Sequence, residues 1–562
     1  MECTVLAGGP DIAAQRELSH HLAYAMEHSH SRLVGVLLVV LPASLALVLS
    51  LLLINRFLSD LDDNARYMIL AQSLATGHGF TLISEPEKPW DKLYPYGYPA
   101  LLAVQMLLFG SEQDLAAVVR LLKLSNSILF AGSVALAYRL ALASASRPIA
   151  VSSTLLTAIS PLVLRYSADV MSEIPFLFFS LLAIITVEKA VKGRGSSRMD
   201  VAAAATLALA FYMRTVGAVL VITAMICVFK RQPEGFSGAA RQAVRIGLFT
   251  ALFLVPWFHQ QAVATPGGDY WTQFTTNVSH PSVDASGSDY GSWDKLLKRS
   301  EENLRGYVFQ QIPRALLPHL SGRADQEWLV LERVLGLVVL ALVALGWATR
   351  ARAGPGVAEI YVLVSLLALS LWWQVDRFLV PLIPLLALFL ASGLHRVAVT
   401  CGRLKGASES LLMALLILPF VISALSLDYF SARANLQRLD AGSPSEYLAD
   451  TMPDFASYFL AAEWLRTNSP PEAVVMSMKP RLMFVYSGRR TVDSPRRGDI
   501  EEVLLTVKTR KVDYVVEDSF IWNRATSRVV TPALRAEQER FTLVYTAGEP
   551  ITNVWRYDRS VK

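Results

Sequence analysis

The sequence has few charged residues and almost no cysteine. Only 18% of its 562 residues are Asp, Glu, Lys or Arg, against roughly 25% in an ordinary soluble domain. With 53% hydrophobic residues and a mean hydropathy of +0.39, this deficit excludes a single soluble globular protein and a disordered chain. The three cysteines, Cys3, Cys227 and Cys401, cannot make a disulfide framework, and no Cys/His cluster has the spacing of metal ligands.

The N-terminal region lacks the features of a signal peptide. It has no short basic start, no short apolar run and no small-residue cleavage site. The segment Leu33–Ile54 contains no charge and is long enough to cross ~30 Å of hydrocarbon. We therefore expect a cytoplasmic tail over 1–32, followed by a retained first span.

Similar apolar runs recur along the chain and predict a polytopic α-helical membrane protein. The segment Gly97–Gly110 is apolar but too short to cross the bilayer, so we interpret it as an interfacial helix. The eleven expected spans are 33–54, 117–142, 149–165, 174–190, 200–213, 215–229, 243–262, 329–348, 356–373, 378–395 and 410–427.

The distribution of Lys and Arg orients these spans. With the N-terminus inside, the short inner connections carry fifteen Lys and Arg residues and the short outer connections carry three. This bias fits the positive-inside rule and predicts an inner- or plasma-membrane protein whose C-terminus lies outside the cytoplasm. The inner residues are Arg139, Arg147, Lys189, Lys192, Arg194, Arg198, Lys230, Arg231, Arg241, Arg245, Arg350, Arg352, Arg396, Arg403 and Lys405, and the outer ones are Arg165, Arg214 and Arg377.

Three longer segments then face the extracytoplasmic side. The outer loops 55–116 and 263–328 belong to a transmembrane core over 33–427, and the amphipathic stretch Trp293–Leu320 suits a helix on the outer leaflet. The segment 428–562 changes composition and predicts an extracytoplasmic α/β domain. Its helical pattern is Phe455–Arg466, and its β-prone runs are Ala473–Met476, Tyr514–Val516, Thr542–Tyr545 and Val554–Tyr557.

The first outer loop carries the densest chemical signal. It contains Asp60-Leu-Asp-Asp-Asn-Ala-Arg-Tyr67 and then Tyr94-Pro-Tyr-Gly-Tyr-Pro99. Asp63 and Tyr67 are four residues apart, so a helix that begins here would place them on one face. Acids at this position also have a structural explanation, because carboxylates stabilise a helix N-terminus.

This loop resembles the first extracytoplasmic loop of the GT-C class of membrane glycosyltransferases that use polyprenyl-phosphate sugars. The class includes protein O-mannosyltransferases, the aminoarabinose transferases of lipid A and rhizobial lipopolysaccharide-core transferases. Asp63, Tyr67 and the Tyr94–Pro99 element match its pattern, whereas Asn64 stands where some members have a second acid. Three later segments also resemble the class: Ser160–Pro175, Arg214 with Gly217, and Asp376–Pro384.

The resemblance implies an inverting glycosyltransferase that moves a sugar from a polyprenyl-phosphate carrier to an extracytoplasmic glycan, lipid or protein. It implies Asp63 as general base, with Asp62 as the alternative, since the incoming hydroxyl must lose a proton. The expected substrate contacts are Lys92, Tyr96, Glu173, Arg214 and Arg377. An arginine fork suits a phosphate.

Each of these residues also has a structural interpretation. The arginines could extend from helix ends to the membrane surface, and Tyr96 could be an interface anchor. We expect no cofactor and no nucleic-acid partner; a divalent metal between Asp63 and Glu173 stays open as an alternative, although the sequence offers no third ligand. Membrane lipid is the expected surroundings of the core.

Three other functions remain open at this point. A secondary transporter would place ionisable residues near the midplane, whereas here they cluster at the outer ends of the spans. A non-catalytic scaffold or sensor with a degenerate transferase core is a second alternative, for which Asn64 is the best sign. The third is a ligase that moves a whole glycan from a diphosphate carrier.

Overall fold

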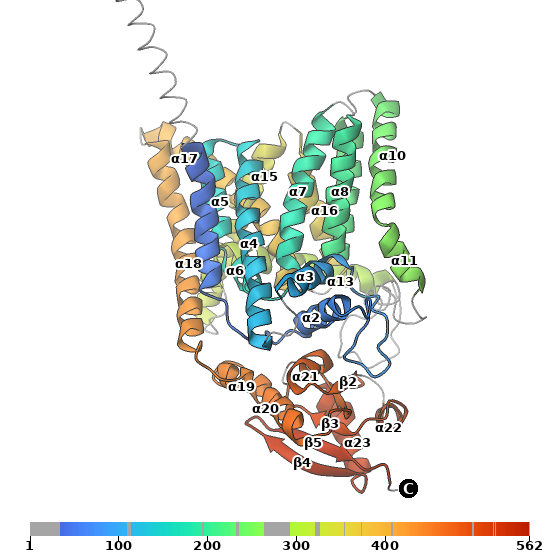
Figure 1. Cartoon of the computed structure of the whole chain (residues 1–562). Helices are drawn as coiled ribbons and strands as arrows, with labels where there is room; N and C mark the ends of the chain where they lie inside the picture. Colours follow the sequence, from blue (N-terminus) through green and yellow to red (C-terminus); the bar gives the residue numbers. More distant parts are fainter. Residues whose placement is uncertain are drawn as a thin grey trace, which may run out of the picture.

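A helical bundle is followed along the chain by a small sheet, which lies at one end of the bundle (Figure 1). The computed structural model describes residues 34–109, 114–193, 196–231, 235–263, 293–320, 326–352, 354–372, 374–405, 408–496, 499–520, 522 and 524–560. The expected cytoplasmic tail and part of the second outer loop therefore lie outside the described residues.

Each of the eleven expected spans falls on helical structure. Among the described residues, six helices are long and apolar enough to cross a membrane, or up to eight if each of two bent pairs is one span, so the count of eleven stays a prediction. The bundle helices are Val34–Leu51, α4 (Leu115–Leu142), α5 (Arg147–Ala158), α6 (Pro161–Ser167), α7 (Glu173–Lys192), α8 (Ser197–Met213), α9 (Ala218–Arg231), α10 (Gly235–Phe253), α11 (Val255–Val263), α15 (Gln326–Ala351), α16 (Val357–Ser370), α17 (Ile383–Lys405) and α18 (Glu409–Gln437).

Several bundle helices are broken near the end that faces the sheet. Helices α5 and α6 meet at 53° and α10 and α11 at 51°. Pro161 begins α6, because proline suits the first turn of a helix but cannot continue one. Helices α8 and α9 are separated by a short 3₁₀ turn, η1 (Thr215–Gly217), where a Cβ on Gly217 would lie 2.6 Å from the backbone nitrogen of Phe211. Helix α17 begins after another 3₁₀ segment, η4 (Asp376–Leu382).

Shorter helices occupy the same end of the bundle. Helix α2 (Asp62–Ala75) and α3 (Gly97–Phe109) lie crosswise below α7 and α8 in Figure 1. Helix α3 is apolar but falls in the class of shorter helices, which fits the expected interfacial segment. The expected amphipathic stretch is helical except at Leu317 and comprises α13 (Trp293–Gly306), the π-helical turn η2 (Tyr307–Gln311), α14 (Ile312–Leu316) and the 3₁₀ turn η3 (Pro318–Leu320).

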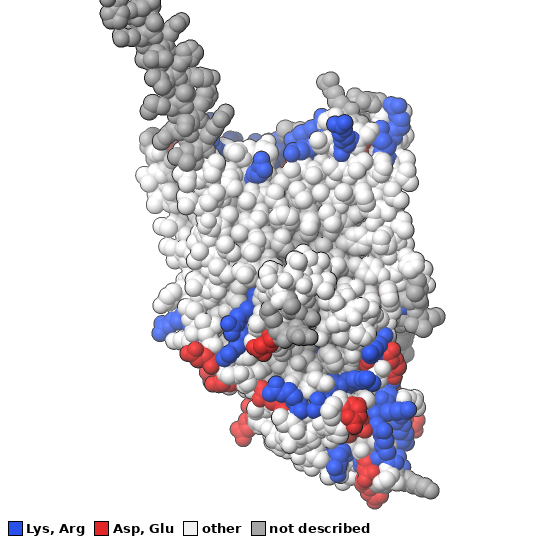
Figure 2. Space-filling view, viewed as in Figure 1, with Lys and Arg blue, Asp and Glu red and all other residues white. Residues whose placement is uncertain are grey.

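The two ends of the bundle differ in charge. Figure 2 shows Lys and Arg along the rim away from the sheet, a broad uncharged belt below it, and mixed charges toward the sheet. Contacts at the cationic rim join connections that are distant in sequence, since Arg350 donates to Ser144 and Lys230 to the backbone oxygen of Pro355. The predicted inner connections thus share one end, and the assignment of that end to the cytoplasm stays a prediction.

The C-terminal part forms a five-stranded mixed sheet of order β2-β1-β3-β5-β4, parallel among β2, β1 and β3. Strands β3, β5 and β4 pair antiparallel. Each expected β-prone run forms a strand. Arg490–Asp493 is a further strand that the sequence did not predict; only its two middle residues are buried, so it has no long apolar run. The strands are β1 (Val474–Ser477), β2 (Arg490–Asp493), β3 (Tyr514–Glu517), β4 (Phe541–Ala547) and β5 (Thr552–Tyr557), and the helices are α19 (Pro444–Leu448), α20 (Pro453–Asn468), α21 (Pro480–Ser487), α22 (Ile500–Thr509), η5 (Thr526–Val530) and α23 (Thr531–Ala536).

The C-terminal part packs against the first outer loop. Helix α21 lies on α2, and the backbone N–H of Thr491 donates to the backbone oxygen of Ser84 at 2.8 Å. The hydroxyl of Tyr486 accepts the backbone N–H of Leu58 at 2.9 Å. One apolar core includes residues of both parts. The domain boundary predicted at 427/428 stays a prediction.

Candidate active site

The Asp63 side chain lies where α2 meets the bundle. Helix α2 begins at Asp62 and carries both aspartates in its first turn, where negative charge stabilises the helix N-terminus. The Tyr94 hydroxyl donates to Asp63 Oδ1 at 2.6 Å, and Arg377 Nη1 donates to Oδ2 at 2.7 Å. The side chains of Asp63 and Arg377 are 30% and 20% exposed. A substrate can therefore reach both.

Glu173 supplies the second carboxylate. It is the first residue of α7 and only 1% exposed. Arg214 Nη1 donates to Glu173 Oε1 at 2.5 Å, and Arg377 Nε lies 3.8 Å from the same oxygen. Glu173 Oε2 has no hydrogen-bond partner among the described residues. Glu173 thus pairs with both arginines, and its Oε2 is available as a hydrogen-bond acceptor.

Breaks in the spans place the two arginines. Arg214 is extended, with φ −153° and ψ 135°, between α8 and η1, and Arg377 lies in η4 before α17. The ring of Phe378 lies between them, 5.6 Å from the Arg214 guanidinium carbon and 5.4 Å from that of Arg377. In an uninterrupted helix, either arginine would lie at another height in the bundle. The breaks therefore place both arginines near Asp63.

The electrostatics of Asp63 reflect this arrangement. Burial alone would raise the pKa of Asp63, but the charges of Arg377 and Arg214 and the hydrogen bonds from Tyr94 and Arg377 together outweigh burial and lower the pKa to about 2. Asp63 is therefore ionised at neutral pH and is a hydrogen-bond acceptor only.

Tyrosines and a serine pack against the residues of the cluster. The ring of Tyr67 packs edge-on against Tyr94 and Tyr98, with centroids 4.7 and 4.9 Å apart. The Tyr67 hydroxyl lies 2.8 Å from Ser172 Oγ, which also accepts from Arg214 at 3.1 Å. Tyr94 and Ser172 were not among the expected site residues. Both lie in segments that resemble the class, Tyr94 in the Tyr94–Pro99 element and Ser172 in Ser160–Pro175, but neither was named as a site residue.

Asp62 faces the other way. Its Oδ1 accepts the backbone N–H groups of Arg481 and Leu482 at 3.2 and 3.3 Å, at the beginning of α21. Arg481 Nη1 lies 3.5 Å from Asp62 Oδ2. Burial raises the pKa of Asp62, although Arg481 opposes this effect. The expected alternative base therefore contacts the C-terminal part.

Two expected contacts lie beside the cluster. Tyr96 packs its ring against Phe80, with the ring centroids 4.5 Å apart. Lys92 is buried, and its backbone oxygen accepts from Gln261 Nε2 at 2.9 Å, which ties the loop to α11. Of the seven residues expected from the sequence, the structure brings together Asp63, Glu173, Arg214 and Arg377.

The described residues contain no group of three or more His, Cys, Asp or Glu side chains that could hold a metal ion. Cys227 and Cys401 are free cysteines, and Cys3 lies outside the described residues.

Comparison with known proteins identifies a related family model. The family model of the dolichyl-phosphate-mannose-protein mannosyltransferases matches residues 94–258. No curated protein matches the sequence.

Solved structures share the fold. An oligosaccharyltransferase from Archaeoglobus fulgidus, tethered to an acceptor peptide, superposes with a TM-score of 0.56 at 14% identity, over 93% of this chain and 74% of that one. ArnT from Cupriavidus metallidurans in the apo state gives 0.56 at 13% identity, over 92% and 97%. ArnT bound to undecaprenyl phosphate gives 0.53 at 14% identity, over 93% and 98%. The chain thus has a helical GT-C-like fold, and its resemblance to the membrane glycosyltransferases that use polyprenyl-phosphate sugars is confirmed.

Proposed function

We propose that the chain is an inverting glycosyltransferase that moves a hexose or pentose from a polyprenyl-phosphate carrier to an acceptor outside the cytoplasm. The observation that carries this proposal is the cluster of Asp63, Glu173, Arg214 and Arg377 beside an apolar bundle. It combines a partly exposed carboxylate with two groups suited to a phosphate. The solved relative bound to undecaprenyl phosphate supports a lipid carrier of this kind.

In the proposed reaction, an acceptor hydroxyl attacks the anomeric carbon of the donor sugar. The bond from that carbon to the phosphate oxygen breaks, and its electron pair leaves with the polyprenyl phosphate. The hydroxyl proton passes to a carboxylate oxygen of Asp63, the proposed general base. A single displacement of this kind inverts the anomeric centre.

Arg377 and Arg214 are the proposed contacts to the departing phosphate. Charge-assisted hydrogen bonds from guanidinium groups would stabilise the negative charge that develops there. Glu173 holds both arginines in the absence of donor, at 2.5 Å from Arg214 and 3.8 Å from Arg377. Because these positions exist before the donor arrives, little reorganisation is needed during the reaction.

The ion pair of Asp63 suggests how donor binding prepares the base. A carboxylate with a pKa of about 2 is a weak base, and Arg377 is the main group that lowers it. A donor phosphate that pairs with Arg377 in its present position would offset this charge. The pKa of Asp63 would then rise, because burial alone raises it, and the carboxylate would become a better proton acceptor in the presence of donor.

A transfer assay tests the proposed activity. The full-length chain is purified and incubated with a panel of radiolabelled polyprenyl-phosphate sugars, and the label that leaves the lipid is measured. We expect the wild type to release label from at least one donor and Asp63→Asn to release far less. A folded wild-type chain that leaves every donor intact would contradict the proposal.

The proposed orientation has its own test. Single cysteines are introduced at Ser196, in the connection between α7 and α8, and at Ser560, after β5. In intact cells, a membrane-impermeant thiol reagent should label position 560 and leave position 196 unlabelled until the cells are permeabilised. Labelling of position 196 alone would place the cluster on the cytoplasmic side and remove it from an outward-facing sugar.

A further inference from the structure

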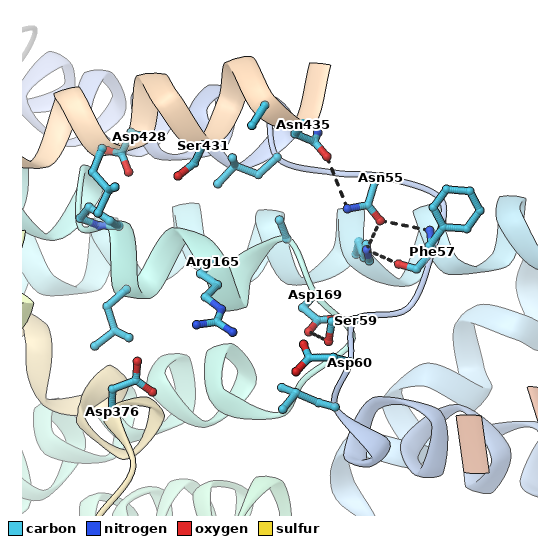
Figure 3. A pocket seen from close by; sticks show the side chains of 18 of the residues that line it. Asn55, Phe57, Ser59, Asp60, Arg165, Asp169, Asp376, Asp428, Ser431 and Asn435 are labelled. Carbon is cyan, nitrogen blue, oxygen red and sulfur yellow. Dashed lines mark hydrogen bonds between the residues drawn. The ribbon is translucent and has the colours of Figure 1, made fainter. Parts of the chain in front are cut away.

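A cavity of about 670 Å³ adjoins the cluster. The connection that follows the first span helix, the segment from α6 to α7, α14 and α18 enclose it (Figure 3). Its volume lies within the range of roughly 300–1,000 Å³ typical of small-molecule sites. None of the catalytic groups assigned above lines it, and nothing so far explains why it is there.

The cavity and the cluster lie against the same three backbone segments. Each segment gives one side chain to the cavity and a nearby one to the cluster. The pairs are Asp60 and Asp63, Asp169 and Glu173, and Asp376 and Arg377. A ligand in the cavity would therefore lie next to the proposed base.

The charges of the cavity wall are balanced. Four cations and four acids line it: Lys123, Arg165, Arg314 and Arg438, and Asp60, Asp169, Asp376 and Asp428. A phosphate dianion would meet the carboxylates of Asp60, Asp169 and Asp376 as well as the cations, which disfavours the donor headgroup here. Hydroxyl groups suit such a wall, because carboxylates accept from them and guanidinium groups donate to them.

Some of these groups are occupied within the protein and shape the wall. Lys123 Nζ donates to Asn55 Oδ1 at 2.8 Å and to the backbone oxygen of Phe57 at 2.6 Å. Asp169 Oδ2 accepts from Ser59 Oγ at 2.6 Å. These contacts hold the connection from the first span helix to α2 in place along one side of the cavity.

Asp428 is different, because its carboxylate is buried without being satisfied. The residue is only 4% exposed, and its Oδ2 has no hydrogen-bond partner among the described residues. A buried polar atom without a partner costs free energy, and ionisable side chains in spanning helices usually mark a substrate pathway. Figure 3 shows Asp428 and Ser431 along α18 on one wall, with Arg165 and Asp376 across the cavity.

Apolar side chains fill the space between these polar groups. Leu162, Leu427 and Pro318 line the cavity, which suits the C–H faces of a sugar ring and the apolar part of a molecule at the membrane surface.

We propose that this cavity is the acceptor site and that it takes an uncharged, hydroxyl-rich saccharide, with Asp428 and Arg165 as specificity-determining contacts. The proposal rests on the proposed glycosyl transfer and assigns its acceptor to the glycans rather than to lipids without sugar or to proteins. The Asp428 carboxyl group forms a hydrogen bond with a hydroxyl of the saccharide, and Arg165 donates to another oxygen. The saccharide is thereby held next to the segment that carries Asp63.

The test measures saccharide and carrier binding separately on the full-length chain in lipid nanodiscs. Maltotriose is the neutral probe and trigalacturonic acid the charged one, both followed by saturation-transfer NMR. Undecaprenyl phosphate is the carrier probe, followed by quenching of tryptophan fluorescence. The variants are Asp428→Ala and Arg165→Gln in the cavity, Arg214→Ala in the cluster, and two matched controls on the exposed surface, Asp450→Asn and Arg139→Gln.

We expect the wild type to bind maltotriose in preference to trigalacturonic acid. Asp428→Ala and Arg165→Gln should each weaken maltotriose binding by about fivefold or more, as expected for loss of one hydrogen bond. Both should bind undecaprenyl phosphate as the wild type does, whereas Arg214→Ala should show the opposite pattern. The controls should change neither, and equal melting temperatures would show that the variants are folded.

Three results would overturn the assignment. Unchanged maltotriose binding in both cavity variants would show that the saccharide lies elsewhere or does not bind. A preference for trigalacturonic acid would contradict the balanced charge. Loss of undecaprenyl phosphate binding in the cavity variants would make the cavity a donor site. Failure of the proposed function is distinct, because the wild type would then bind maltotriose but not undecaprenyl phosphate.

Discussion

The two faces of helix α2 place adjacent aspartates in different parts of the molecule. Asp63 faces the bundle, where Arg377 and Tyr94 lower its pKa to about 2. Asp62 faces the C-terminal part, where burial raises its pKa and it accepts the first N–H groups of α21. Two side chains of the same type, one residue apart, thus acquire opposite shifts, so the surroundings and not the residue type select the base.

The comparison also indicates how the base is positioned. Arg481 is buried between Asp62, Glu85 and Asp493, at 3.5, 3.5 and 2.8 Å. These contacts join α2, the loop that follows it and β2. Asp62 therefore helps to hold α2 in position, and this position presents Asp63, the proposed base, to the cluster.

Replacement of the two aspartates should separate these roles most strongly. Asp63→Asn keeps the size of the side chain but cannot accept a proton at neutral pH, so turnover should fall by ~10²–10⁴-fold. Undecaprenyl phosphate binding should change little, since the proton moves only on the way to the transition state. Asp62→Asn should keep most of the turnover. Label release from the donor lipid measures both, and the reverse ranking would make Asp62 the base.

The arginines should show an intermediate effect that includes donor affinity. Arg377→Ala and Arg214→Ala each remove a charge-assisted hydrogen bond of about 1.5–3 kcal/mol, which corresponds to roughly 10–150-fold. Both donor affinity and turnover should drop, because the phosphate is present before and during the reaction. Arg377→Lys should recover only part of the loss, because lysine lacks the planar fork. Full recovery by lysine would show that a point charge is enough.

The local features of the sequence predicted much of this fold. Uncharged runs and the Lys/Arg bias are properties of short segments, and each expected span coincides with helical structure. The four clustered residues, Asp63, Glu173, Arg214 and Arg377, were named because each follows a span in a recognisable motif. Their roles stay predictions. The four side chains lie close together because the spans that they follow all end at the same level of the bundle.

Long-range partners could not be predicted. The contact of Asp62 with Arg481 spans 419 residues, and no local pattern identifies it. The sequence pointed to Tyr96 and not to Tyr94, because the hydrogen bond from the Tyr94 hydroxyl to Asp63 joins residues 31 positions apart. The cavity is built from six separate segments and has no motif at all.

Loss of Arg481 should act on the base only indirectly. Arg481→Ala leaves three carboxylates without their common partner, and breaking such a buried pair typically costs ~3–5 kcal/mol of stability. The melting temperature should fall, and turnover should fall by a few-fold because α2 is held less firmly. Arg481→Lys should restore more of the melting temperature than Arg481→Gln does. A loss of turnover as large as that of Asp63→Asn would place Arg481 in the chemistry.

The smallest expected effect concerns the pH dependence of the C-terminal part. Burial raises the pKa of Asp518 to about 6, although its carboxylate accepts from Thr526 Oγ1 at 2.8 Å and from the N–H of Phe520 at 3.3 Å. The unfolded chain has a value near ~3.9 for aspartate, so between these values the folded chain binds more protons.

The associated stability is therefore complete below about pH 4 and is lost as the pH rises through 6; two pKa units correspond to at most about 3 kcal/mol. Asp518→Asn keeps an acceptor but does not titrate, so its melting temperature should change less than that of the wild type between pH 5 and pH 8. The exposed Asp450→Asn should follow the wild type. Because Asp518 lies far from Asp63 in sequence and contacts none of the cluster, Asp518→Asn should leave the pH profile of turnover unchanged. A shift of that profile would show that the two faces of α2 are coupled through the sheet, and the separation between Asp62 and Asp63 would then be incomplete.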